Sequence, residues 1–105
     1  MTGKESGGFC CKIYSHSGET LVAMCDAELV GKKFSEKDLR LFVDEKFYRE
    51  KACDEGGVKE LFREATMLNL VGKRIIEIAI AEGFVNKDSI ITIDSVPHAQ
   101  YAALK

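Results

Sequence analysis

Hydrophobic and polar positions alternate in the first third of the chain, and this pattern predicts a β-hairpin. Two strand-like runs, FCCKIYSH and ETLVAMC, flank the dipeptide Ser17-Gly18. That dipeptide suits a two-residue hairpin loop because glycine tolerates positive φ. Residues whose numbers sum to 35 then face each other, so Phe9 pairs with Asp26 and Cys10 with Cys25. One face of this hairpin is apolar, whereas the other is mixed and is expected to be partly solvated.

After Gly56-Gly57, which is expected to break the chain, the pattern changes to helical spacing. VKELFREATMLNL carries apolar residues along one helical face, and VGKRIIEIAIAEG continues in register with little polar face left. We therefore predict two consecutive helices, with Asn69 as a break or N-cap between them and Gly83 as the C′ glycine of the second. One long, kinked helix is the alternative. The nearly all-apolar second helix also suggests a homo-oligomer.

Two further segments predict strands, LRLFV near the middle of the chain and SIITIDSV near its end. Pro97 is expected to end the last strand, because proline cannot donate to a ladder, and HAQYAALK is predicted to form a short terminal helix. The order of elements indicates the α+β class. We expect a small, mainly antiparallel sheet with an N-terminal hairpin, two consecutive helices packed on one face and a late C-terminal strand.

The composition is that of one globular domain. The chain has 105 residues, of which 46% are hydrophobic and 30% charged, so we expect a flexible tail over 1–8 and a single domain over 9–105. No apolar run approaches the roughly 18 residues needed to span a bilayer, and no signal peptide is evident. A cytoplasmic location without membrane association is expected. The net charge of -2 gives no global basic field for nucleic acid, which leaves only a local basic patch.

The four cysteines, at positions 10, 11, 25 and 53, form no CxxC pair and no zinc-finger spacing with histidine. They are expected to be free thiols in a reducing compartment. The predicted hairpin sets Cys10 opposite Cys25, so a redox bridge or a pair of metal ligands is the alternative. No metal and no cofactor are expected.

The stretch VPHAQ, residues 96–100, is the first candidate site. His98 could act as a general acid or base because the unperturbed pKa of histidine lies near 6.5, and Gln100 could hydrogen-bond a ligand. The structural alternative is that Pro97 fixes a turn while His98 donates to a backbone carbonyl.

The stretch Asn69–Arg74 is the second candidate. If a helix begins here, its first amides point outward, Gly72 permits close approach, and Lys73 and Arg74 add charge for a phosphate. The P-loop pattern GxxxxGK[ST] is absent, however. The alternative is that Gly72 allows close helix packing while Lys73 and Glu77 form an ion pair.

Basic and aromatic residues mix in the segment FYREK, where Phe47 and Tyr48 precede Arg49 and Lys51. Such mixtures can stack bases and hold phosphates. Acidic residues interleave with them and largely cancel the field, so a solvated strand end and loop is the alternative.

Several stretches together resemble the small archaeal family catalogued as domain of unknown function 424: KIYSHSGETLVAMCDAELVGKKF, then N-x-VG at Asn69 to Gly72, Gly83, and VPHAQ. The resemblance implies a single small α+β domain in an archaeal cytoplasm and supplies no catalytic residues. From the residues themselves we favour a non-catalytic binding module for RNA or a translation-related protein partner. The alternatives are a small-ligand or enzymatic site using His98 near the Asn69–Arg74 corner, and an oligomer-forming protein.

Overall fold

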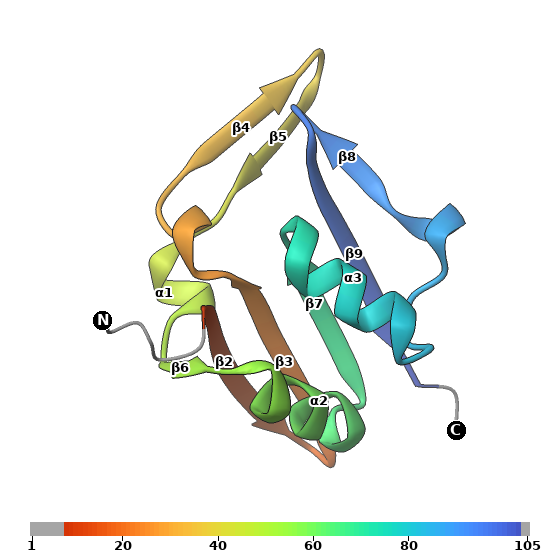
Figure 1. Cartoon of the computed structure of the whole chain (residues 1–105). Coiled ribbons are helices and arrows are strands. Elements are labelled where there is room, and N and C mark those ends of the chain that lie inside the picture. The colour runs from red at the N-terminus through yellow and green to blue at the C-terminus, as the bar shows by residue number, and fades with distance from the viewer. Residues whose placement is uncertain (1–7, 104–105) are drawn as a thin grey trace.

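The computed structural model describes residues 8–103 and has the predicted α+β class (Figure 1). A six-stranded sheet has the order β6-β2-β3-β7-β9-β8, and β4 and β5 form a separate two-stranded sheet. The pairing is antiparallel throughout, except between β3 and β7. The strands are β2 (Phe9–His16), β3 (Glu19–Asp26), β4 (Lys33–Glu36), β5 (Leu39–Phe42), β6 (Lys51–Cys53), β7 (Met67–Val71), β8 (Ile91–Ile93) and β9 (Val96–Ala102). The helices are α1 (Glu45–Tyr48), α2 (Glu55–Glu64) and α3 (Lys73–Ala81), with 3-10 turns η1 (Ala27–Leu29) and η2 (Lys87–Ser89).

The predicted hairpin is confirmed in both extent and register. β2 and β3 pair with residue numbers that sum to 35, and Ser17 (φ 50°) and Gly18 (φ 83°) both adopt the left-handed conformation that a tight hairpin loop requires. The expectation of a partly solvated second face is wrong for the end of the hairpin away from its loop. Cys10 and Cys25 lie there in a second buried cluster, beneath Val43 and Tyr48. The sheet therefore has a core on each side.

Helices α2 and α3 pack over one face of the sheet, as predicted (Figure 1). Their buried side chains meet the apolar side of the hairpin in the main core. The apolar side of α3 is covered within the chain, since Ile76 is buried and Ile80 packs partly buried against the same core. The apolar character of this helix therefore no longer supports an oligomer. Among residues 8–103, no helix has the length and apolar character that crossing a membrane demands.

The prediction of helix across residues 58–70 is wrong in its second half. Helix α2 ends at Glu64, and residues 67–71 form the central strand β7. Asn69 thus lies in mid-strand and is neither a helix break nor an N-cap. Most side chains on both faces of β7 are apolar, so the strand shows little alternation of apolar and polar residues, which is why its sequence could be mistaken for helix. The Gly56-Gly57 pair does not break the chain either, because it lies in the first turn of α2, where Asp54 accepts a 2.8 Å hydrogen bond from the Gly57 amide.

The C-terminal prediction also needs correction. Strand β8 ends before a turn at Asp94 and Ser95, and Pro97 lies inside β9 rather than ending a strand. Residues 98–102 continue that strand and form no helix, while residues 104–105 lie outside the described part. Proline is tolerated here because β7 ends beside it, so the ladder needs no N–H donor at this position. The Pro97 carbonyl accepts a hydrogen bond from the Gly72 amide at 2.9 Å, one position beyond the last pair of the β7–β9 ladder.

The remaining predictions have mixed outcomes. Residues 39–42 are a strand, β5, but it pairs only with β4 in the small sheet. Gly83 is confirmed as the C′ glycine of α3, with φ 84°, and the Phe84 amide donates to Ala79 as in a Schellman motif. The expectation of four free thiols is wrong, because a disulfide joins Cys11 to Cys53. The predicted tail falls mostly on residues 1–7, which lie outside the described part.

Candidate functional site

Pairing of β7 with β9 places three candidate residues on one face of the sheet. Asn69 pairs with Gln100, and Val71 pairs with His98. Because side chains alternate along a strand, these residues lie opposite Leu68, Leu70 and Ala99, which belong to the main core beneath the helices. We call the side that carries Asn69, His98 and Gln100 the outer face.

Helix α1 fixes the side chain of Asn69 on the outer face. The hydroxyl of Tyr48 donates to Asn69 Oδ1 at 2.7 Å, and Tyr48 is only 4% exposed. Desolvation by burial raises the pKa of Tyr48 above its ordinary value, so the hydroxyl stays protonated and remains a donor. The asparagine amide is thereby held in one orientation.

A shallow groove of about 340 Å³ runs beside this amide. Its lining includes Leu21, Met67, Asn69, Gln100 and Ala102. The register places Leu21, Met67 and Ala102 in one row across β3, β7 and β9, next to the row of Asn69 and Gln100. Met67 is 42% exposed. The groove therefore combines an apolar row with two carboxamide groups.

An aromatic stack borders the same row. Tyr14 pairs with Leu21 across the hairpin, and its ring stacks on Phe47 with centroids 5.3 Å apart and an interplanar angle of 26°. The Tyr14 hydroxyl donates to the Phe47 carbonyl at 2.9 Å. Lys12 Nζ lies 5.3 Å from the Tyr14 ring centroid and donates to the Lys46 carbonyl at 2.9 Å. An ammonium group and two aromatic rings thus lie side by side.

His98 has the contact that the structural alternative predicts. Its Nδ1 lies 3.0 Å from the Leu70 carbonyl oxygen, so that nitrogen carries the proton and donates to the main chain. The imidazole is thereby tied to the neighbouring strand, and only Nε2 is left for a ligand.

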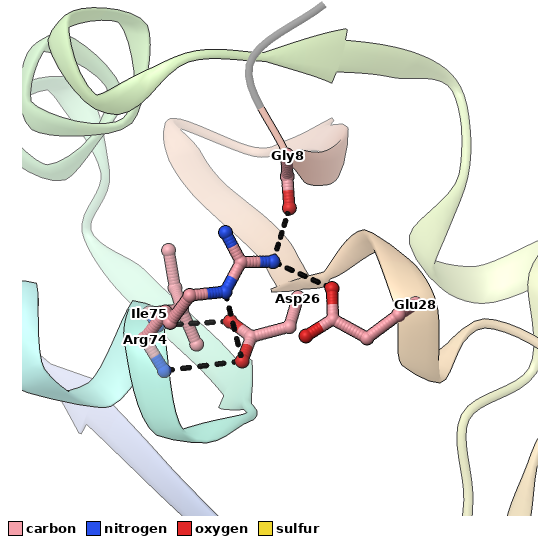
Figure 2. A network of polar contacts seen from close by, with 5 residues as sticks. All are labelled: Gly8, Asp26, Glu28, Arg74 and Ile75. Atoms are coloured by element: carbon pink, nitrogen blue, oxygen red, sulfur yellow. Dashed lines mark hydrogen bonds and ion pairs between the residues drawn. The ribbon is translucent and has the colours of Figure 1, made fainter. Parts of the chain in front are cut away.

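The amides that begin α3 do not point outward, contrary to the sequence prediction. Figure 2 shows the Asp26 carboxylate against them: Oδ2 accepts from the Arg74 amide at 3.0 Å and Oδ1 from the Ile75 amide at 2.9 Å. Gly72 precedes them with φ 123°, and a Cβ there would lie 2.6 Å from Asp26 Oδ2. Gly72 is therefore needed to admit an internal carboxylate, which occupies the place proposed for a phosphate.

The Arg74 guanidinium is also used within the protein. It donates to the Gly8 carbonyl at 2.9 Å and pairs with Glu28, and Nε lies 3.8 Å from Asp26 (Figure 2). Burial raises the pKa of Asp26, while hydrogen bonds from the Arg74 and Ile75 amides and the charge of Arg74 oppose that rise. The positive charge of Arg74 thus stabilises the ionised form of the buried Asp26 carboxyl group.

Lys73 is exposed and lines a small cavity of about 160 Å³ with Ser95, Val96 and Pro97. The two candidate segments therefore meet, through the Gly72 amide and the Pro97 carbonyl, but they do not form one site around His98. Asn69, His98 and Gln100 come together on the outer face, whereas Gly72 and Arg74 serve the Asp26 network.

The fold and these groups define a small α+β domain whose outer sheet face carries amide, aromatic and cationic groups as a candidate binding surface. The family described as "Protein of unknown function (DUF424)" matches residues 14–104, and the chain belongs to this family. Its fold is similar to that in the crystal structure of an uncharacterised conserved protein from Methanopyrus kandleri, with a TM-score of 0.74 and 22% identity over 92% of this chain and 94% of that chain. No curated protein matches the sequence.

Proposed function

We propose that this domain is a non-catalytic binding module whose outer face holds single-stranded RNA. The observation that carries the proposal is the Tyr14–Phe47 stack, with Lys12 beside it and the Asn69–Gln100 amides on β7 and β9, across the intervening strand β3. Unpaired bases stack on aromatic side chains and hydrogen-bond through their edges, while lysine neutralises phosphate. The three kinds of group needed for this recognition therefore share one surface.

Local charge sets the expected strength of binding. Arg49 is paired with Glu45 at 2.8 Å, so we assign the phosphate contacts to Lys12, which lies over the Tyr14 ring, and to the exposed Lys46, which precedes Phe47 in α1. For single strands, the logarithm of the binding constant falls with that of salt by about 0.7 per phosphate neutralised. Two phosphates give a slope of roughly -1.4, which describes a weak and salt-sensitive complex.

The test is fluorescence anisotropy of labelled single-stranded RNA with the full chain at low and moderate salt. Tyr14→Leu keeps an apolar side chain against Phe47 but removes the ring, and loss of one stacked base costs about 1–3 kcal/mol. Affinity should therefore fall by roughly 5-fold to 150-fold.

Lys12→Ala should lower the salt slope by about 0.7. Lys87→Ala is the matched control, because Lys87 is exposed in η2, between α3 and β8. The proposal fails if RNA is not retained at low ionic strength, or if the Lys87 variant loses as much affinity as the Lys12 variant. Far-UV circular dichroism of each variant checks that the fold is intact.

The groove beside Asn69 and Gln100 favours a second candidate, a small molecule that pairs with carboxamides and covers Leu21 and Met67. An enzymatic role for His98 has less support, because its Nδ1 already donates to Leu70. The two candidates differ in salt dependence. A neutral small ligand would bind with little change between low and moderate salt, and Gln100→Ala would weaken it without any effect from Lys12→Ala.

A further inference from the structure

The two thiols outside the disulfide face each other inside the protein. Cys10 of β2 pairs directly with Cys25 of β3, and both cysteines are free. They are 6% and 0% exposed and lie in the cluster beneath Val43 and Tyr48. The hairpin thus holds a preformed dithiol in apolar surroundings, on the opposite side of the sheet from the Cys11–Cys53 bond.

The kind of strand pair fixes how far apart these thiols stand. The Ala27 amide donates to the Gly8 carbonyl at 2.9 Å, so residues 8 and 27 form a hydrogen-bonded pair. Such pairs alternate along an antiparallel ladder, which makes Cys10 and Cys25 a hydrogen-bonded pair as well, with Cα atoms about 5.5 Å apart. Their Cβ atoms then lie at the wide end of the range of about 4.5–5.5 Å, whereas a disulfide requires about 3.8 Å. The spacing suits an atom placed between the sulfurs better than a direct bond.

The surroundings supply both an entrance and a counter-charge. Cys10 lines an open groove of about 680 Å³ together with Arg49 and Lys51. Arg49 is half-exposed and lines this groove with Cys10, and its guanidinium also pairs with Glu45 at 2.8 Å. A negatively charged thiolate group would therefore meet a guanidinium at the mouth of the groove.

We propose that Cys10 and Cys25 together bind a soft, thiophilic metal ion in two-coordinate geometry, for which the cuprous ion is the probe. Each thiol releases its proton to solvent, two sulfur–metal bonds form, and no electron is transferred. Metal–sulfur bonds of about 2.3 Å allow the sulfurs to stand up to roughly 4.6 Å apart, which fits the wide pair. Thiolates select soft ions, and the resulting anionic centre would be balanced by Arg49.

Harder ions do not fit this site. Zinc needs four ligands, and residues 8–103 contain no group of three or more His, Cys, Asp or Glu side chains that could hold a metal. The choice of a two-coordinate soft ion thus follows from the number of donors as well as from their chemistry.

The test is an oxygen-free titration of the full chain against cuprous ion held by a chromophoric chelator. The wild-type protein should withdraw one equivalent. Cys10→Ser and Cys25→Ser should each lower the affinity at least tenfold, whereas the double variant Cys11→Ser, Cys53→Ser, in which the other two cysteines are replaced, should retain it.

A second measurement needs no variant and so does not depend on their folding. Iodoacetamide labelling of the wild-type protein, followed by mass spectrometry, should modify Cys10 at least tenfold more slowly when the ion is bound. The inference is overturned if the wild type withdraws no copper, if binding survives loss of Cys25, or if binding disappears in the Cys11 and Cys53 double variant. None of these results depends on whether the outer face holds RNA.

Discussion

Replacement of Asp26 by alanine should destabilise the protein more than its single side chain suggests. Asp26 is 3% exposed, and its carboxylate accepts from the amides of Arg74 and Ile75 at the start of α3. The variant removes an N-terminal cap, worth about 1 kcal/mol, and leaves the buried Ile75 amide without an acceptor, at about 1–3 kcal/mol. We count nothing for the half-exposed Arg74 ion pair, because such pairs contribute little. The expected loss is about 2–4 kcal/mol.

The assay is urea-induced unfolding at constant pH with the disulfide intact, read as the midpoint and slope of the transition. Glu28→Ala is the matched control, because Glu28 also pairs with Arg74 but is exposed to solvent. That variant should change stability by no more than about 0.5 kcal/mol. A loss below about 1 kcal/mol for the Asp26 variant, or an equal loss for both, would refute the reasoning.

A double-mutant cycle with Gly72 isolates the contact between the two residues. Gly72→Ala places a Cβ 2.6 Å from Asp26 Oδ2 and also strains a residue at φ 123°. Removing the carboxylate relieves the first cost but not the second. The double variant should therefore lose less stability than the sum of the single losses, by about 0.5–3 kcal/mol. Additive losses would show that Gly72 is required for its backbone conformation alone.

Three further predictions concern buried polar groups. Burial raises the pKa of Cys25 to about 12, so above pH 9 this thiol ionises in the unfolded chain before it does in the folded protein. The free energy of unfolding should therefore fall by about 1.4 kcal/mol per pH unit above pH 9. Cys25→Ala should lessen this fall in urea unfolding measured at a series of pH values, and an unchanged dependence of stability on pH would contradict the prediction. Denatured protein kept free of reductant should titrate two thiols, and four after reduction, if Cys11 is bonded to Cys53; four without reductant would exclude the bond. Tyr48→Phe should cost about 1 kcal/mol in urea unfolding through its bond to Asn69, whereas no loss would mean that water replaces the hydroxyl.

The sequence predicted the hairpin well because its register is decided locally. The Ser17-Gly18 loop fixes every pair between β2 and β3, including Cys10 with Cys25. The apolar face of the hairpin followed from that register. The burial of the opposite face did not, because it depends on Val43 and Tyr48, which reach it from later in the chain.

Strand β7 could not be recognised, for two physical reasons. Both faces of this central strand carry apolar residues, and only Asn69 interrupts the run from Met67 to Val71, so no period of two is visible. The helical spacing of α2 also continues by chance as far as Leu68. Only the pairing of β7 with β3 and β9 makes this segment a strand.

Candidate site residues were found, but their grouping was not. Asn69, His98 and Gln100 share a face only because β7 pairs with β9. The stack of Tyr14 on Phe47 joins positions 33 residues apart, and Asp26 accepts a hydrogen bond from the Arg74 amide 48 residues later, in the first turn of α3. Such contacts leave no local signal in a single sequence, although the mixture of aromatic and basic residues near Phe47 did point to this region.

Two of the stretches by which the sequence resembles its family, N-x-VG and VPHAQ, prove to be partners in one ladder. The Gly72 amide donates to the Pro97 carbonyl, Val71 pairs with His98, and the His98 imidazole donates to the Leu70 carbonyl. These contacts account for the proline and the histidine as parts of the joint between β7 and β9. The pair of Asn69 and Gln100 is different, since the groove on the outer face lies against both carboxamides, although Asn69 also accepts from the Tyr48 hydroxyl. Functional tests should therefore begin with these two amides and the neighbouring stack rather than with the imidazole.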